Sequence, residues 1–218
     1  MRLSKRCLNL AKSAAIVCAA LASVPALGQE RLRIALAWRP TSDVNDLPSV
    51  FSPERWTHDA TKDVPPSDTF DGLHVRVLPF VDKRKEKDVG ANTEERWARP
   101  VTTDDDVAAF VTGHLGEVLQ GAHVDVTDSG ANRLLKGEVV TFFVNEENTY
   151  SGTVLLRVTV TDAHEHRLWE GTAVGHSHRF GHSMSEENYD ETFSDSLVDA
   201  VADLLKNQSF QRAVRERR

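Results

Sequence analysis

Histidine side chains gather in the C-terminal part of the chain, where they suggest metal binding. Five of the nine histidines lie between residues 164 and 182. His164 and His166 flank an expected turn, about 30 Å along a strand from His176 and His178, because each strand residue advances about 3.3 Å. This leaves His176, His178 and His182 as one ligand set, since imidazole binds zinc and alternate strand residues share a face. The alternative is a solvent-exposed strand end.

A serine nucleophile is a weaker hypothesis. The segment 181–185, Gly-His-Ser-Met-Ser, approaches a nucleophile elbow but lacks the final glycine, and no histidine follows His182. Ser183 is better explained as a helix cap, with Glu186 completing a capping box. The chain contains neither a phosphate-binding loop nor a dinucleotide-binding glycine motif. These patterns favour a non-enzymatic protein, and no cofactor is predicted.

Three other residues are candidates for contact with a partner. Asp82 and Arg84 share one face at the end of an expected strand, where they bridge to each other or to a neighbour. Trp169 lies in a later strand, on the face opposite Leu168. The alternative for Asp82 and Arg84 is a salt-bridged strand end without a functional role.

The first 28 residues have the composition of a cleavable secretory signal peptide. A basic start is followed by an apolar stretch from Ser13 to Ala22, which is too short to span a bilayer. Ala26 and Gly28 supply the small residues that precede a cleavage site, so Gln29 is the expected new N-terminus. We therefore expect an exported protein that resides in the periplasm.

Cleavage would change both the cysteine content and the charge. Cys7 and Cys18 both lie in the signal segment, so the mature chain would form no disulfide. Cys18 is a poor site for a lipid because Ala15-Ile16-Val17 precedes it. The net charge is −7, and loss of four cations with no acid leaves −11. An acidic protein of this kind disfavours nucleic acid and anionic lipid as partners.

The mature chain divides into an arm and a domain. Residues 29–72 begin with an expected strand at 31–38 and continue as an extended, proline-rich arm. Residues 73–218 are expected to form one domain, with strands at 73–81, 123–127, 134–145, 149–162 and 167–179. A helix follows Thr103 or Asp104, and a long helix carries an apolar stripe at Tyr189, Phe193, Leu197, Val201 and Leu204.

The predicted fold is α+β, with the order β-α-β-β-β-β-α. Each helix has a single apolar stripe, so both helices are expected on one face of a mostly antiparallel sheet, in a two-layer sandwich. The charged stretch 82–100 is predicted to be a loop.

Several short segments together resemble the YajG-type envelope lipoproteins of Gram-negative bacteria, and more loosely the periplasmic auxiliary components of envelope transport systems. They are residues 75–84 (Val-Arg-Val-Leu-Pro-Phe-Val-Asp-Lys-Arg), 115–121, 135–139, 150–154, 168–171, Tyr189 and 197–210. The resemblance implies an α+β domain without catalytic residues at the periplasmic side of the outer membrane. This chain departs from the family in lacking a suitable lipid-attachment cysteine.

Two functional hypotheses follow. The first is a non-enzymatic interaction or assembly module of the cell envelope, with an envelope protein as partner and peripheral association with the outer membrane as an open question. The second is a periplasmic protein that binds a small ligand or a metal.

Overall fold

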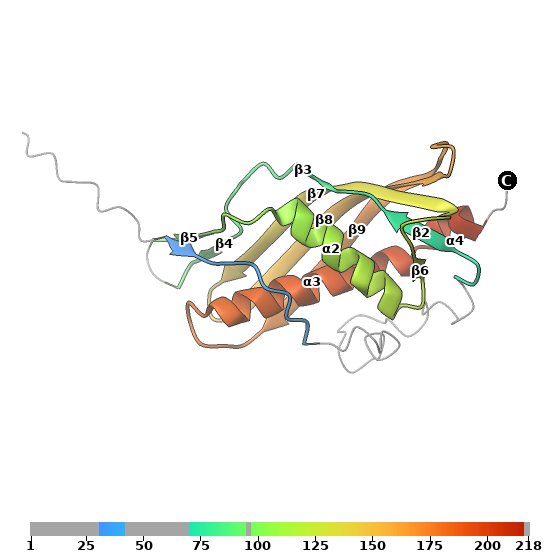
Figure 1. Cartoon of the computed structure of the whole chain (residues 1–218). Helices are drawn as coiled ribbons and strands as arrows, with labels where there is room; N and C mark the ends of the chain where they lie inside the picture. Colours follow the sequence, from blue (N-terminus) through green and yellow to red (C-terminus); the bar gives the residue numbers. More distant parts are fainter. Residues whose placement is uncertain (1–30, 42–69, 95–96, 216–218) are drawn as a thin grey trace, which may run out of the picture.

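The fold is described from a computed structural model, which covers residues 31–41, 70–94 and 97–215 (Figure 1). The expected signal peptide, both cysteines and most of the proline-rich arm lie outside the described residues. Within the described residues, no helix is both long and apolar enough to cross a membrane.

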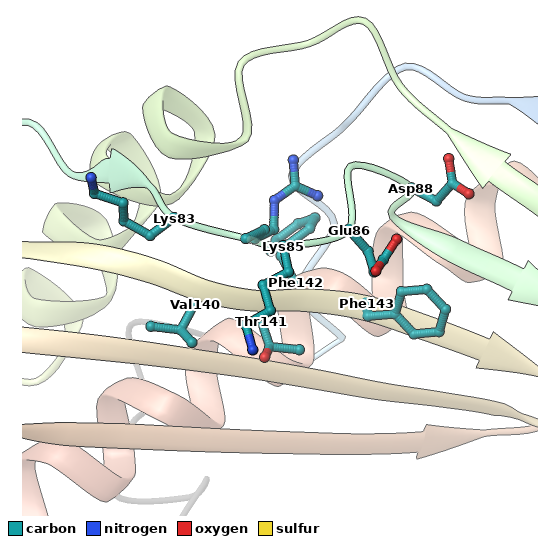
Figure 2. Close-up of a pocket in the computed structure, with 9 residues that line it drawn as sticks. Lys83, Lys85, Glu86, Asp88, Val140, Thr141, Phe142 and Phe143 are labelled. Carbon is teal, nitrogen blue, oxygen red and sulfur yellow. The ribbon is translucent and has the colours of Figure 1, made fainter.

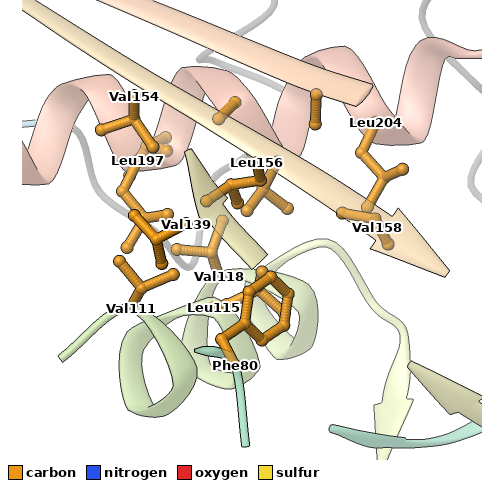
Figure 3. Packing of buried hydrophobic residues seen from close by; sticks show 14 of the residues in the cluster. Phe80, Val111, Leu115, Val118, Val139, Val154, Leu156, Val158, Leu197 and Leu204 are labelled. Atoms are coloured by element: carbon orange, nitrogen blue, oxygen red, sulfur yellow. The ribbon is translucent and has the colours of Figure 1, made fainter. Parts of the chain in front are cut away.

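Three long antiparallel strands form the centre of the sheet. They are β7 (Arg133–Glu146), β8 (Tyr150–Asp162) and β9 (Arg167–Arg179), each within one residue of its predicted bounds at either end. The hydrophobic alternation that predicts them becomes a buried face along β8, where Val154, Leu156 and Val158 are all buried. These residues point toward the helices (Figure 3).

On the side away from β8, strand β7 pairs with three short parallel strands, one after another along its length. They are β2 (His74–Val77), β3 (Val81–Asp82) and β4 (Gly90–Asn92). Val75 lies opposite Arg133, Val81 opposite Glu138, and Gly90 opposite Val144. Residues 74–92 therefore follow β7 along its length, with loops between the paired segments.

Short strands complete a nine-stranded mixed sheet. Strand β5 (Arg99–Thr102) pairs antiparallel with β4 and parallel with β1 (Leu32–Arg33), whereas β6 (Asp125–Val126) pairs parallel with β2. The sheet is therefore mixed: its long β7–β8 and β8–β9 pairs are antiparallel, whereas several of its short pairs are parallel. The prediction of a loop at 82–100 was wrong, because β4 and β5 lie in this stretch. Strands of two to four residues are too short to show an alternating pattern, and their partners are distant in sequence.

Helices α2 (Val107–Gly121) and α3 (Glu186–Lys206) lie against the same face of the sheet (Figure 1). Phe142 of β7 stacks on Phe193 of α3 at 4.3 Å between ring centroids and meets Phe110 of α2 edge-on at 5.8 Å. The whole predicted apolar stripe of α3 is buried. The α+β class is thereby confirmed.

The helix ends differ in detail from the sequence expectation. Asp106 caps α2 by accepting hydrogen bonds from the N–H groups of Ala108 and Ala109, in place of Thr103 or Asp104. Ser185 caps α3 in place of Ser183. Asn207 ends α3 as predicted, and the C-terminal amphipathic tail is a helix, α4 (Gln208–Arg215).

Helix α3 approaches strand β9 unusually closely. A Cβ atom added to Gly175 would lie 1.9 Å from the carbonyl oxygen of Ser196, so only glycine fits there. Asp199 and Asp203 of α3 accept hydrogen bonds from the N–H groups of His176 and Val174, at 2.7 and 3.0 Å. The helix thus covers this part of the sheet edge, which would otherwise be open to pairing with another strand.

Candidate functional site

A pocket of about 410 Å³ lies between the β3–β4 loop and the middle of β7 (Figure 2). The loop supplies residues 83–86 and Asp88, and β7 supplies residues 140–143. The chain meets β7 at both ends of the loop. Lys83 N–H donates to the Val139 carbonyl, and Val144 N–H donates to the Val89 carbonyl, both at 2.9 Å.

The number of residues on each side explains why this loop bows away from β7. From the Asp82–Val139 pair to the Gly90–Val144 pair, the loop side advances eight residues and β7 only five. A β-bulge between Val139 and Thr141 adds a local irregularity to β7. The surplus loop residues cannot lie flat in the sheet, so they arch over the strand and leave the pocket beneath.

An ion cluster holds the start of the loop. Arg84 donates through Nε to Asp82 Oδ1 and through Nη2 to Asp82 Oδ2, both at 3.1 Å, and its side chain is only 7% exposed. Lys87 Nζ lies 2.9 Å from Asp82 Oδ2. Burial alone would raise the pKa of Asp82, but the hydrogen bonds from Arg84 and Lys87 outweigh it and hold this pKa well below its usual range.

Asp82 and Arg84 therefore bridge to each other, one of the two arrangements expected from the sequence. A bidentate guanidinium–carboxylate pair fixes both groups in one geometry. Since Arg84 is buried, the pair shapes the pocket wall, and the exposed loop residues Lys83, Lys85 and Glu86 are the ones available to a bound molecule.

The floor of the pocket has a different character from its rim. Val140, Thr141 and Phe143 are half-buried residues of β7, whereas Lys83 and Lys85 are exposed. Figure 2 shows the Phe143 ring below the loop carboxylates. An apolar floor with a charged rim suits a molecule or peptide that has both apolar and ionic groups.

The three histidines expected to bind a metal do not form a ligand cluster. His176 Nδ1 lies 3.3 Å from Thr153 Oγ1, and His178 Nδ1 lies 2.9 Å from Ser151 Oγ. His182 uses its carbonyl to accept a hydrogen bond from Tyr150. Across the described part of the chain, no group of three or more His, Cys, Asp or Glu side chains is arranged to hold a metal ion. The structure thus gives no support to the zinc hypothesis.

Trp169 lies against helix α4. Its indole Nε1–H donates to Ser209 Oγ at 2.8 Å, and its ring meets Phe210 edge-on at 5.3 Å. The ring also covers Gly171, where an added Cβ would clash with it. These contacts give Trp169 a structural task, which is to hold the C-terminal helix on the sheet.

A buried polar cluster at the other end of β7 is centred on Glu146, a residue that the sequence analysis did not single out. Glu146 is buried and accepts hydrogen bonds from Tyr189 Oη at 2.6 Å and from Met184 N–H at 2.8 Å. Burial would raise the pKa of Glu146, yet these hydrogen bonds outweigh it and lower the pKa. The alternation of Phe142 and Val144 was the available signal, because it places Glu146 on the buried face.

Tyr150 extends this cluster to the start of α3. Its hydroxyl donates to the His182 carbonyl at 2.6 Å and accepts from Ser185 N–H at 3.1 Å. Burial raises the pKa values of both Tyr150 and Tyr189, so the two phenols stay neutral donors. The cluster ties the β9–α3 connection to the end of β7, and Glu146, Tyr150 and Tyr189 are all buried in it.

Comparison with known proteins gives distant structural neighbours only. No protein-family model and no curated protein matches this chain. A Xanthomonas campestris protein described as DUF330 matches 61% of this chain and 81% of its own length, with 8% identity and a TM-score of 0.44. The PelC dodecamer from Paraburkholderia phytofirmans matches 60% of this chain and 88% of its own, with 12% identity and a TM-score of 0.36. The YajG-type resemblance has no family-model match and stays a prediction.

Proposed function

We propose that this protein is an exported, non-enzymatic interaction or assembly module of the bacterial cell envelope, which uses the pocket beside β7 to dock an envelope protein. The pocket is the observation that carries the proposal. It opens to the surface between an apolar strand and a charged loop, and the pair formed by half-buried Asp82 and buried Arg84 holds that loop in place. Such a preformed surface lowers the ordering cost of binding.

Export is part of this proposal and rests on residues 1–28. Their basic start, short apolar stretch and small residues before Gln29 are those of a cleavable signal. N-terminal sequencing of the protein recovered from a periplasmic extract tests it, and the expected first residue is Gln29. Recovery from the cytoplasm with Met1 intact would contradict export.

We infer that the protein is not an enzyme from the roles of the ionisable groups whose pKa values are shifted. Asp82 binds Arg84, Glu146 binds Tyr189, and Asp199 accepts from the backbone of β9. Perturbed pKa values often mark catalytic sites, but structural ion pairs and hydrogen bonds also produce them. Here Glu146 and Asp199 each join two elements of the fold, and Asp82 fixes the start of the β3–β4 loop, which supports structural roles.

Site-specific photo-crosslinking in living cells tests docking at the pocket. We would place p-benzoylphenylalanine at Lys85 on the pocket rim, with Glu117 on the exposed side of α2 as the matched control. The expected result is a discrete crosslinked envelope protein at Lys85 only. Equal products at both positions, or none at Lys85, would contradict the pocket as the docking surface.

A small ligand is the second candidate for the same pocket. Its volume of about 410 Å³ falls within the range of ordinary ligand sites, about 300–1,000 Å³. Native mass spectrometry of protein purified from its own periplasm would detect a retained small molecule. A mass that is lost in a Phe143→Ala variant would favour this candidate over protein docking.

A further inference from the structure

Strand β7 has an unpaired stretch where it passes the β3–β4 loop. Lys83 N–H donates to the Val139 carbonyl at one end of this stretch, and Val144 N–H donates to the Val89 carbonyl at the other end. Between these two bonds, no backbone hydrogen bond among the described residues joins the loop to β7. The stretch advances five residues, or roughly 17 Å of extended strand. We call it the gap, and the pocket in Figure 2 lies over it.

The backbone of Phe142 points into the gap. Val144 directs its N–H toward the loop side of β7, and residues two positions apart in a strand direct their backbone groups the same way. Phe142 lies opposite Val154 of β8, and this is therefore a non-hydrogen-bonded pair. The β-bulge between Val139 and Thr141 comes before Phe142, so it leaves the alternation from Phe142 to Val144 intact.

Both backbone groups of Phe142 lack a hydrogen-bond partner among the described residues. The residue is nevertheless only 1% exposed. A backbone N–H or carbonyl that is shielded from water and unpaired costs about as much free energy as a lost hydrogen bond. Phe142 also lines the pocket, so a molecule bound there can reach these groups. The gap therefore favours an occupant that supplies one acceptor and one donor at the spacing of a peptide backbone.

An extended peptide meets this requirement with a single residue. In an antiparallel pair, one residue exchanges both N–H···O=C bonds with the residue opposite. Addition of a strand to an open sheet edge is a recurrent mode of peptide binding, in which the main chain provides affinity and the side chains provide specificity. The hydrogen bonds at the two ends of the gap limit the paired segment to a few residues.

The two faces of the sheet set different limits on the side chains of such a peptide. The residue opposite Phe142 would point to the helix side, where the Phe142 ring already packs against Phe110 and Phe193. A close-packed core leaves room there only for a small side chain. The neighbours of that residue would point to the outer face, beside half-buried Thr141 and Phe143. The expected motif is a small residue between two apolar ones.

We propose that the pocket binds a short extended peptide segment, which pairs through its backbone with Phe142 of β7. This rests on the docking function proposed above, which makes the segment part of the envelope partner, and it adds how that partner is held. The exposed rim residues Lys85 and Glu86 carry opposite charges, so the net charge of the rim does not select the peptide. Backbone pairing and the apolar floor do so instead.

Replacing single backbone amides by esters tests whether the Phe142 N–H is unpaired. Phe142→phenyllactate keeps the ring and removes the N–H, whereas Val144→hydroxyisovalerate removes the N–H that donates to the Val89 carbonyl. Each ester also weakens the carbonyl of the preceding residue, which faces β8 in both cases, so the comparison isolates the lost N–H. In urea denaturation, the unfolding equilibrium constant should be about 2- to 10-fold larger for the Val144 ester. Equal constants would overturn the proposal.

A phage-displayed library of random linear peptides tests binding in the gap. The library is first depleted on a Thr141→Arg variant, in which a long side chain fills the pocket, and is then selected on the wild-type protein. Enriched peptides are synthesised, and fluorescence anisotropy gives their affinities for the wild type and for the two ester variants. The Val144 ester is the matched control, because its lost N–H already has a partner in the fold.

The expected peptides carry a small residue between two apolar ones. They should bind the Phe142 ester at least about fivefold more weakly than the wild type, because the peptide carbonyl loses its donor. Their affinity for the Val144 ester should stay within about twofold of the wild type. N-methylation of the residue that pairs with Phe142 should weaken binding similarly, because it removes the donor to the Phe142 carbonyl. Failure to enrich any peptide, or equal affinity for the Phe142 ester and the wild type, contradicts backbone pairing.

The outcome is separable from that of photo-crosslinking at Lys85. An envelope protein crosslinked at Lys85, with peptides that bind the Phe142 ester as well as the wild type, would retain docking at the pocket and overturn backbone pairing. Peptides that require the Phe142 N–H, without any crosslinked protein at Lys85 in cells, would support a peptide-binding gap and contradict the envelope partner.

Discussion

Tyr189 of α3 donates its hydroxyl hydrogen to the buried carboxylate of Glu146, the last residue of β7, at 2.6 Å. This bond ties the long C-terminal helix to the central strand of the sheet. Tyr189→Phe should lower the free energy of unfolding by about 1.5–3 kcal/mol, because a buried charged acceptor loses its donor. Urea denaturation measures it, with Glu147→Gln, one residue further on and exposed, as a control expected to change stability by less than about 0.5 kcal/mol.

The same pair predicts an acid dependence. The pKa of Glu146 is lowered from its ordinary value of 4.5 in the folded protein. Its contribution to stability is therefore complete above pH 4.5 and is lost as the pH falls through the lowered folded value. Glu146→Gln should flatten the decline in unfolding free energy below pH 4.5. If the unfolding free energy of this variant declines below pH 4.5 as steeply as that of the wild type, other groups account for the decline.

Asp199 should have the opposite pH dependence. Burial raises its pKa from 3.8 to about 6, so the cost of ionising it in the fold is absent below pH 3.8 and complete above pH 6. Asp199→Asn keeps an oxygen that accepts from His176 N–H and removes this titration. The stability of the variant relative to the wild type should increase by on the order of 2 kcal/mol between pH 4 and pH 7.5. Urea titrations at both pH values test this, and an unchanged difference would contradict it.

The close approach of α3 to β9 predicts that Gly175 tolerates no side chain. Gly175→Ala places a Cβ atom 1.9 Å from Ser196 O and 2.3 Å from Ala200 N, so the helix must shift away from the sheet. We expect a loss of about 3 kcal/mol or more. Gly113→Ala is the matched control, since nothing lies within 4 Å of its added Cβ on α2. It should stabilise the protein by about 0.5–1 kcal/mol. Equal effects in thermal unfolding would contradict the packing argument.

Removing the Asp82 carboxylate should loosen the pocket wall. Asp82→Ala leaves the Arg84 guanidinium buried without its bidentate partner, and we expect a loss of about 2–3 kcal/mol. Lys87→Ala removes only the exposed hydrogen bond to the same carboxylate and should cost less than about 1 kcal/mol. Hydrogen exchange of residues 83–89 should increase in the first variant only. Comparable exchange in both would indicate that Arg84 does not hold the loop.

Trp169 should control the docking of α4. Trp169→Ala removes the hydrogen bond to Ser209 and the contact with Phe210. Trypsin should then cleave at Arg212 and Arg215 much faster than in the wild type, because the helix leaves the sheet. Ser209→Ala, which keeps the ring contact, should show an intermediate rate. Unchanged cleavage in Trp169→Ala would mean that other contacts hold α4.

The amino-acid sequence by itself determined the elements whose signal is periodic and local. Strands β7 to β9 follow from alternation, and α3 follows from its apolar stripe and the break at Asn207. These patterns repeat every two to four residues, so they can be recognised within a single element. Each long element buries one face, and this face is apolar whichever elements pack against it. The composition likewise predicts export and an acidic mature chain without any reference to the fold.

Only the tertiary structure decided which distant residues meet. It placed β3 and β4 parallel to β7 and so created the pocket, put Glu146 against Tyr189, and placed the Ala37 N–H beside Asp190 of α3. It also showed that His176, His178 and His182, which the sequence spacing suggested as one ligand set, contact different partners. Short parallel strands and backbone-to-carboxylate contacts produce no periodic pattern of apolar residues in the sequence. They are stabilised by partners tens of residues away, which a local pattern cannot reveal.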